Sequence, residues 1–284
     1  MTTNGEQCPA DGAWQRLDDL EDRAKATLSE QLKPFETAFR DTYEAGVIAP
    51  VLREDAPVEA DVRCAALHFK RVLNDLRSVW LLLRSGYTSQ AASVAASLYE
   101  NALATVCLTA SAKNVQTYLA NDSGELPWTP MAMAKMVVEH EGHAPGGKDY
   151  ENQWRALYAH YVWLCQTKHP TMPSIVHDTS ASAVRDGYVV MALPNVRPQD
   201  LPLKAQVAII SLHRAHESIE AFVNAFGFRG HPPNIHRFSE RFSAAKQQAW
   251  AAYEPYLKAV NPISIHKSWF PKKYPHTNDF QERA

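Results

Sequence analysis

The chain has 284 residues, of which 45% are hydrophobic and 21% charged, with a formal net charge of -2 at pH 7. This length is sufficient to bury a substantial core. The near-neutral charge gives no global electrostatic case for nucleic-acid binding, although it leaves room for a local basic patch.

Cysteine usage and the N-terminal residues both favour a cytoplasmic protein. Cys8, Cys64, Cys107 and Cys165 form no CxxC pair, which argues against a disulfide framework or a zinc knuckle and favours reduced thiols. Residues 1–14 have neither a basic segment nor an apolar run, so no signal peptide is predicted.

Apolar side chains recur at helical spacing through most of the chain, and these stretches end at prolines, glycines and polar loops. The predicted helices span about 13–45, 59–85, 87–112, 131–141, 148–167, 203–226 and 234–260. A further segment at 114–121 either continues the third helix or follows a bend. Pro34 is expected to kink or divide the first helix, and Gly86 to end the second. Thr88 or Ser89 is expected to cap the third helix.

Residues 170–197 interrupt this helical pattern. The stretch contains no convincing helix, and Tyr188 to Leu193 favours a short strand or an extended strip. A segment this long indicates a functional lid or irregular packing. Without any alternation of strand and helix, the sequence predicts an all-α bundle of five to seven helices with one irregular insertion. We expect a single helical domain over 1–284, with extended termini at 1–12 and 263–284.

The predicted helix at 87–112 is almost devoid of charge. Glu100 is the only formally charged side chain between Arg84 and Lys113. This composition favours a helix surrounded by protein on most sides, and its polar residues argue against a membrane span. Because an isolated buried charge is very costly, Glu100 is expected to be largely buried and to meet a polar partner.

Residues 78–169 resemble an uncharacterised bacterial all-helical family, a domain of unknown function. The resemblance rests on the order of an apolar helix ending in Gly, a helix reading AASLYENAL, and an aromatic helix closing as LYAHYVWLCQTKHPT. It implies a helical core in which Glu100, Tyr158 and His169 lie close together. The family pattern places an Arg four positions before the Glu, where this chain has Ala96, so the corresponding ion pair is not expected.

Glu100 and His169 are the first candidate pair for chemistry. A carboxylate that is hydrogen-bonded to an imidazole orients the ring and raises its basicity, as in a general base. The alternative is a structural network in which Glu100 satisfies tyrosine or backbone donors in the core.

A metal site is the second candidate. One helical face carries His213, His216, Glu217 and Glu220. Imidazoles and carboxylates on such a face can hold a divalent metal ion if another helix supplies further ligands. Glu100, His169 or the cluster from Glu139 to His143 are candidate further donors. The alternative is a solvated helical face.

A metal-independent ribonuclease of the HEPN type is the third candidate. Such enzymes are helical bundles with an Arg-x4–6-His motif, and a distant resemblance is carried by Arg63 with His68 and by Arg155 with His160. Because residues five apart on a helix point about 140° away from each other, neither pair readily forms one site.

Three functions are therefore open: a binding or structural module with a polar centre at Glu100, a metal-independent ribonuclease, and a metal-dependent hydrolase. The first is the preferred interpretation. We also expect a homodimer formed through a helical face and no membrane association, and RNA is a possible partner that the net charge does not support.

Overall fold

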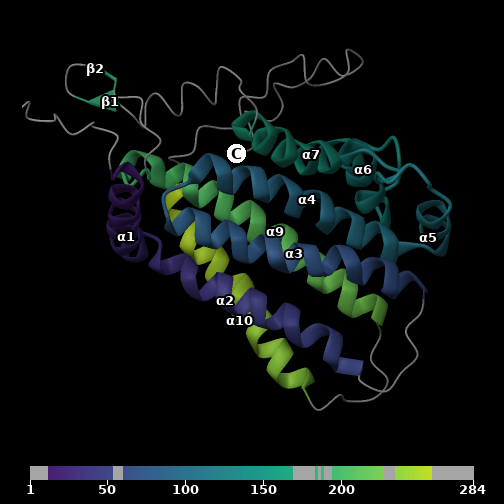
Figure 1. Ribbon diagram of the computed structural model, residues 1–284. Helices are drawn as coiled ribbons and strands as arrows, with labels where there is room; N and C mark the ends of the chain where they lie inside the picture. Colours follow the sequence, from purple (N-terminus) through teal and green to yellow (C-terminus); the bar gives the residue numbers. More distant parts are fainter. Residues whose placement is uncertain are drawn as a thin grey trace, which may run out of the picture.

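The computed structural model describes residues 12–53, 60–168, 183–184, 187–188, 194–226 and 234–257, and they form an all-α bundle (Figure 1). The α-helices are α1 (Ala13–Gln31), α2 (Lys33–Ile48), α3 (Ala60–Arg84), α4 (Thr88–Ala110), α5 (Ala112–Leu119), α6 (Pro130–His140), α7 (Lys148–Lys168), α9 (Leu201–Phe226) and α10 (Ile235–Tyr253). Short 3-10 helices span Ala49–Arg53, Pro198–Asp200 and Glu254–Tyr256.

The all-α prediction is confirmed, but the described residues contain more α-helices than the five to seven expected. Leu32 separates α1 from α2, with Pro34 in the first turn of α2, as the sequence predicted. The short helix α5 is a separate element rather than a continuation of α4 and accounts for the rest of the difference, whereas α6 lies where the sequence predicted a helix.

Part of the predicted irregular insertion lies within the described residues. There, β1 (Ala183–Val184) pairs antiparallel with β2 (Gly187–Tyr188), with Ala183 opposite Tyr188. The predicted strip beyond Tyr188 and the extended terminus at 263–284 lie outside the described residues.

Helix α4 forms the centre of the bundle. It packs against α3, α9, α7 and α6, and 15 of its 23 residues are buried. Figure 1 shows α3, α4 and α9 running side by side, with α6 and α7 over one side of α4 and the paired α2 and α10 on the opposite side of the bundle. Because many α4 core residues are alanines, the neighbouring helices can approach closely. By length and composition α4 could cross a membrane, but most of it is enclosed by the other helices.

The turn between α3 and α4 is fixed by a close backbone contact. Gly86 has φ +84°, a left-handed conformation that favours glycine, and its carbonyl accepts a hydrogen bond from the Asn195 amide at 2.9 Å. The expected side-chain cap at Thr88 or Ser89 is not formed, since Tyr87 occupies the N-cap position. Thr88 instead donates a hydrogen bond to Asp200 at 2.6 Å, a contact across 112 residues that local sequence cannot reveal.

Candidate functional site

Glu100 contacts a tyrosine of the aromatic helix α7, as expected, but the tyrosine is Tyr161 rather than Tyr158. The Tyr161 hydroxyl on α7 donates a hydrogen bond to the Glu100 carboxylate at 2.6 Å. Burial raises the pKa of Tyr161, and the bond to Glu100 raises it further, so the phenol stays protonated and acts as the donor. Glu100 is half-buried rather than largely buried. Its expected partner His169 lies outside the described residues.

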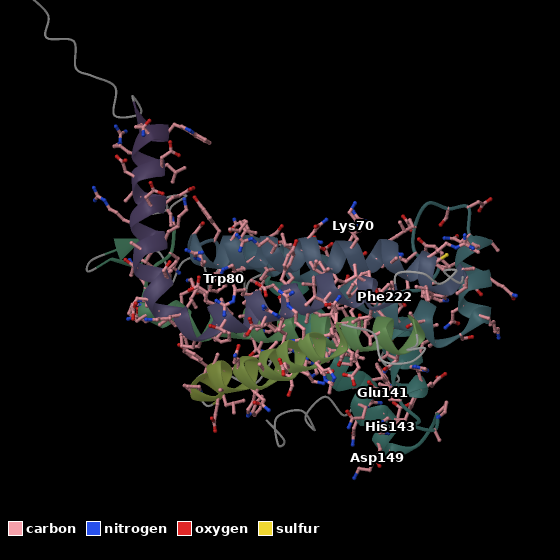
Figure 2. All side chains as sticks on the ribbon, turned by 90° about the horizontal axis from the view of Figure 1, so that it is seen from below. Lys70, Trp80, Glu141, His143, Asp149 and Phe222 are labelled. Carbon is pink, nitrogen blue, oxygen red and sulfur yellow. The ribbon has the colours of Figure 1, made fainter. Side chains whose placement is uncertain are left out.

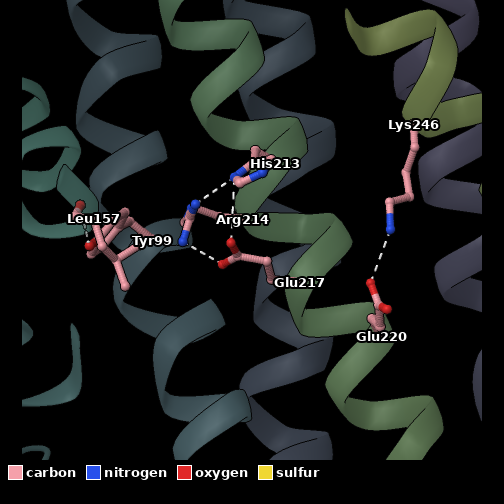
Figure 3. Close-up of polar contacts among 7 residues, drawn as sticks. All are labelled: Tyr99, Leu157, His213, Arg214, Glu217, Glu220 and Lys246. Carbon is pink, nitrogen blue, oxygen red and sulfur yellow. Dashed lines mark hydrogen bonds and ion pairs between the residues drawn. The ribbon is translucent and has the colours of Figure 1, made fainter. Parts of the chain in front are cut away.

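Three tyrosines connect this contact to the interior of the bundle. Tyr158 stacks on Tyr161, with ring centroids 6.0 Å apart, and Tyr161 lies 5.4 Å from the ring of Tyr99. Tyr99 is fully buried on α4, and its hydroxyl donates to the Leu157 carbonyl at 2.7 Å (Figure 3). Tyr158 therefore lies in the aromatic layer, while Tyr161 contacts the carboxylate.

A buried arginine lies over the other side of this layer. The Arg214 guanidinium, on α9, is 5.9 Å from the centre of the Tyr99 ring. Its side chain is only 3% exposed. One terminal nitrogen donates to Glu217 and the other to Nδ1 of His213 (Figure 3). A cation with so little exposure requires partners, and these two residues provide them.

Glu217 and His213 form the edge of the cluster that is exposed to solvent. Burial raises the pKa of Glu217 to about 7, against the opposing effect of Arg214, and nearby Glu141 raises it as well. Near neutral pH this carboxyl group therefore exists in both protonation states. The His213 ring is 60% exposed, so water reaches one edge of the cluster.

His160 approaches the same cluster from α7. Burial, together with the nearby Arg214 and His213, lowers the pKa of His160 to about 3, so the imidazole is neutral at pH 7. Within the part of the chain that the structure describes, its Nδ1 atom is buried without a hydrogen-bond partner. The same holds for Nε of Arg214. Native proteins rarely leave such nitrogens unpaired unless water, an ion or a ligand reaches them.

The predicted metal-binding face does not converge on one point. His213 and Glu217 lie together at 3.5 Å, but His216 is 5% exposed and faces away. Its Nε2 atom is 2.7 Å from the Thr42 hydroxyl, and its ring packs edge-on to Phe242. Among the described residues, no group of three or more His, Cys, Asp or Glu side chains is arranged to hold a metal ion.

Among the described residues, the further metal donors considered from the sequence complete no ligand group with His213 and Glu217, although Glu141 lies near Glu217. Glu139 accepts a hydrogen bond from Tyr150 at 2.9 Å. Figure 2 shows Glu141 and His143 at one end of the molecule, beyond the end of α6.

The two Arg-x4-His pairs have separate partners. Arg155 forms an ion pair with Glu151 at 2.9 Å, while His160 approaches Arg214 and His213. His68 lies between Asn101 at 2.9 Å and Tyr118 at 3.1 Å, which connects α3, α4 and α5. Its partner in the sequence motif, Arg63, is exposed.

A second buried ion pair was not foreseen from the sequence. Lys204, at the start of α9, has a fully buried side chain and pairs with Asp200, which also accepts from Thr88. Burial lowers the pKa of Lys204, against the opposing effect of Asp200. Because the pair is enclosed at the junction of α4 and α9, it holds the two helices together.

Arg214 is the main residue that sequence reasoning missed. The available signal was a cation among the mostly apolar residues of the predicted helix at 203–226. Comparison of the chain with known protein families, with curated proteins and with solved structures finds no match.

Proposed function

We propose that the protein is a binding module whose polar centre extends from Glu100 across Tyr99 to Arg214, and that it binds a small anion beside Arg214. The observation that carries the proposal is the pair of buried nitrogens without hydrogen-bond partners among the described residues, Nε of Arg214 and Nδ1 of His160. Both belong to a cluster that reaches solvent at His213.

Stability alone gives weak support for the alternative, a purely structural network. Replacing a buried ion pair by apolar residues of similar volume is often neutral or stabilising. The fold therefore has no general need for Arg214 and Glu217 at this position. An unpaired guanidinium N–H in addition leaves a donor without compensation for its lost hydration.

The chemistry of the cluster fits a carboxylate or a phosphate. Arg214 can donate to ligand oxygens through Nε, and a neutral His160 can donate through Nδ1 in one of its tautomers. Glu217 has a pKa of about 7, so it can take up a proton when an anion competes with it for Arg214. Binding of an anion is then coupled to proton uptake and is tighter at pH 6 than at pH 8.

Thermal unfolding in the presence of inorganic phosphate or acetate tests this proposal. A ligand at ten times its Kd stabilises the folded state by about 1.4 kcal/mol, which raises the Tm of a chain of this size by roughly 2 °C. The increase should disappear in Arg214→Lys, because lysine has no Nε–H in that position. Arg241→Lys is the matched control, since Arg241 pairs with Glu44 between α10 and α2. No increase with either anion, or an increase that survives in Arg214→Lys, contradicts the proposal.

The ribonuclease alternative has one supporting observation. His160 and His213 lie near Arg214, and imidazoles beside a guanidinium are suitable groups for metal-independent phosphodiester cleavage. Against it, an imidazole with a pKa of about 3 is a poor general base at neutral pH. Cleavage of a labelled RNA by the wild type and its loss in His160→Ala and His213→Ala would favour this alternative over simple binding.

A further inference from the structure

Helix α3 carries a row of exposed cations on its outer face. Arg63, Lys70 and Arg77 follow each other at intervals of seven residues, with Arg71 beside Lys70, and all four are exposed. Seven residues advance about 10.5 Å along a helix and two turns around it, so the row is straight and about 21 Å long. Figure 2 shows Lys70 pointing outward from α3, away from the bundle.

The four cations form no close ion pair among the residues that the structure describes, although burial raises the pKa of the Asp75 carboxyl group and nearby Arg71 opposes this rise. None of them takes part in an ion pair there, whereas Lys25, Arg155 and Lys246 each do. Asp75 offsets part of the charge of Arg71, and its carboxylate also accepts a hydrogen bond from Ser97 at 2.9 Å. A protein with a net charge of -2 thus concentrates positive charge along one helix face.

The surroundings of the row narrow the choice of partner. The exposed apolar residues of α3, Leu67 and Leu81, are about 21 Å apart along the helix. They form no contiguous centre of the kind that anchors protein interfaces. The aromatic residues Phe69 and Trp80 are buried, so α3 offers no platform for the base stacking that single strands use. Regularly spaced cations without stacking groups are suited to a regular row of phosphates.

We propose that the outer face of α3 binds the sugar-phosphate backbone of a nucleic-acid duplex without reading its sequence. This surface is separate from the polar cluster of α4, α7 and α9, and the inference does not depend on the function proposed for that cluster. Arg63, Lys70, Arg71 and Arg77 each contact one phosphate.

Fluorescence anisotropy with labelled 24-base-pair DNA and RNA duplexes of one sequence tests the proposal. With four phosphate contacts, the slope of log K against log salt is about -3.6, which corresponds to a roughly 150-fold loss of affinity between 50 and 200 mM salt. Lys70→Gln/Arg77→Gln should make this slope shallower by about 1.8 and weaken binding to every sequence equally.

The matched control is Lys25→Gln/Lys246→Gln, which removes two lysines that are paired with acids elsewhere and whose side chains are 44% and 48% exposed. It should bind like the wild type, and all variants should keep the wild-type Tm. The proposal is overturned if the wild type binds neither duplex at 50 mM salt, or if the α3 variant and the control have equal slopes. Binding to phosphatidylserine vesicles without binding to duplexes also overturns it, in favour of a membrane surface. Arg214→Lys should retain duplex binding, which separates this surface from the polar cluster.

Discussion

Removing the Arg214 side chain should destabilise the protein mainly because Glu217 then lacks its cationic partner. Arg214→Met keeps an unbranched side chain of similar reach but deletes the cation that Glu217 accepts from. Breaking a buried ion pair by removing one partner costs about 3–5 kcal/mol. Glu217 is 25% exposed and can take up a proton, so we expect a smaller cost, about 2 kcal/mol at pH 8.

The converse substitution should cost more. Glu217→Gln leaves a guanidinium that is 3% exposed and cannot lose its proton, so a cost of about 3 kcal/mol is expected. The double variant Arg214→Met/Glu217→Gln removes both charges, and its free energy of unfolding should lie within about 1 kcal/mol of the wild type. The coupling free energy between the two residues is then about 4 kcal/mol.

Urea unfolding of the four proteins at pH 5.5 and pH 8 measures these quantities. The cost of Arg214→Met should be smaller at pH 5.5, because Glu217, with a pKa of about 7, is then protonated in the wild type and in the variant. A cost below about 0.5 kcal/mol at both pH values would refute the reasoning. So would a double variant whose destabilisation equals the sum of the two single ones.

Three further predictions test other parts of the fold. Burial holds the pKa of His216 at about 3, so the folded state opposes protonation of this ring as the pH falls below 6.5. The free energy of unfolding therefore decreases between pH 7.5 and pH 5, and His216→Asn should make this decrease smaller by about 2 kcal/mol. Gly86→Ala should cost about 2–4 kcal/mol in urea unfolding, because the new Cβ lies 2.8 Å from the Asn195 amide nitrogen; Gly142→Ala, which also has positive φ but open space around it, should cost only about 1 kcal/mol. Burial raises the pKa of Cys107 to about 12, so mass spectrometry should show slow alkylation of Cys107 by iodoacetamide in the folded protein and fast alkylation in urea; equal rates would contradict this placement.

Local sequence signals predicted most of the helix positions because they depend on neighbouring residues. Apolar periodicity located α3, α4 and α9, and Gly86 ended α3 because a left-handed residue is needed at that turn. The break at Leu32 followed from Pro34. These features are decided within a few residues of chain.

Contacts between distant helices were not accessible in the same way. The absence of other charges around Glu100 correctly marked it as a residue that needs a partner, yet nothing in the sequence distinguishes Tyr161 from Tyr158 as the donor. The choice depends on which face of α7 packs against α4. The shared helical face of His213, His216 and Glu217 was equally visible. Tertiary packing places His213 beside Arg214 and His216 beside Thr42, and the sequence does not show this separation.

Histidine NMR signals during a phosphate titration test the central claim most directly. The claim predicts that the imidazole 1H–15N correlations of His160 and His213 shift together and saturate as phosphate is added. The correlations of His68 and His216, which are hydrogen-bonded to Asn101 and Thr42, should stay in place as internal controls. No shift of His160 and His213, or an equal shift of all four histidines, would contradict an anion site beside Arg214.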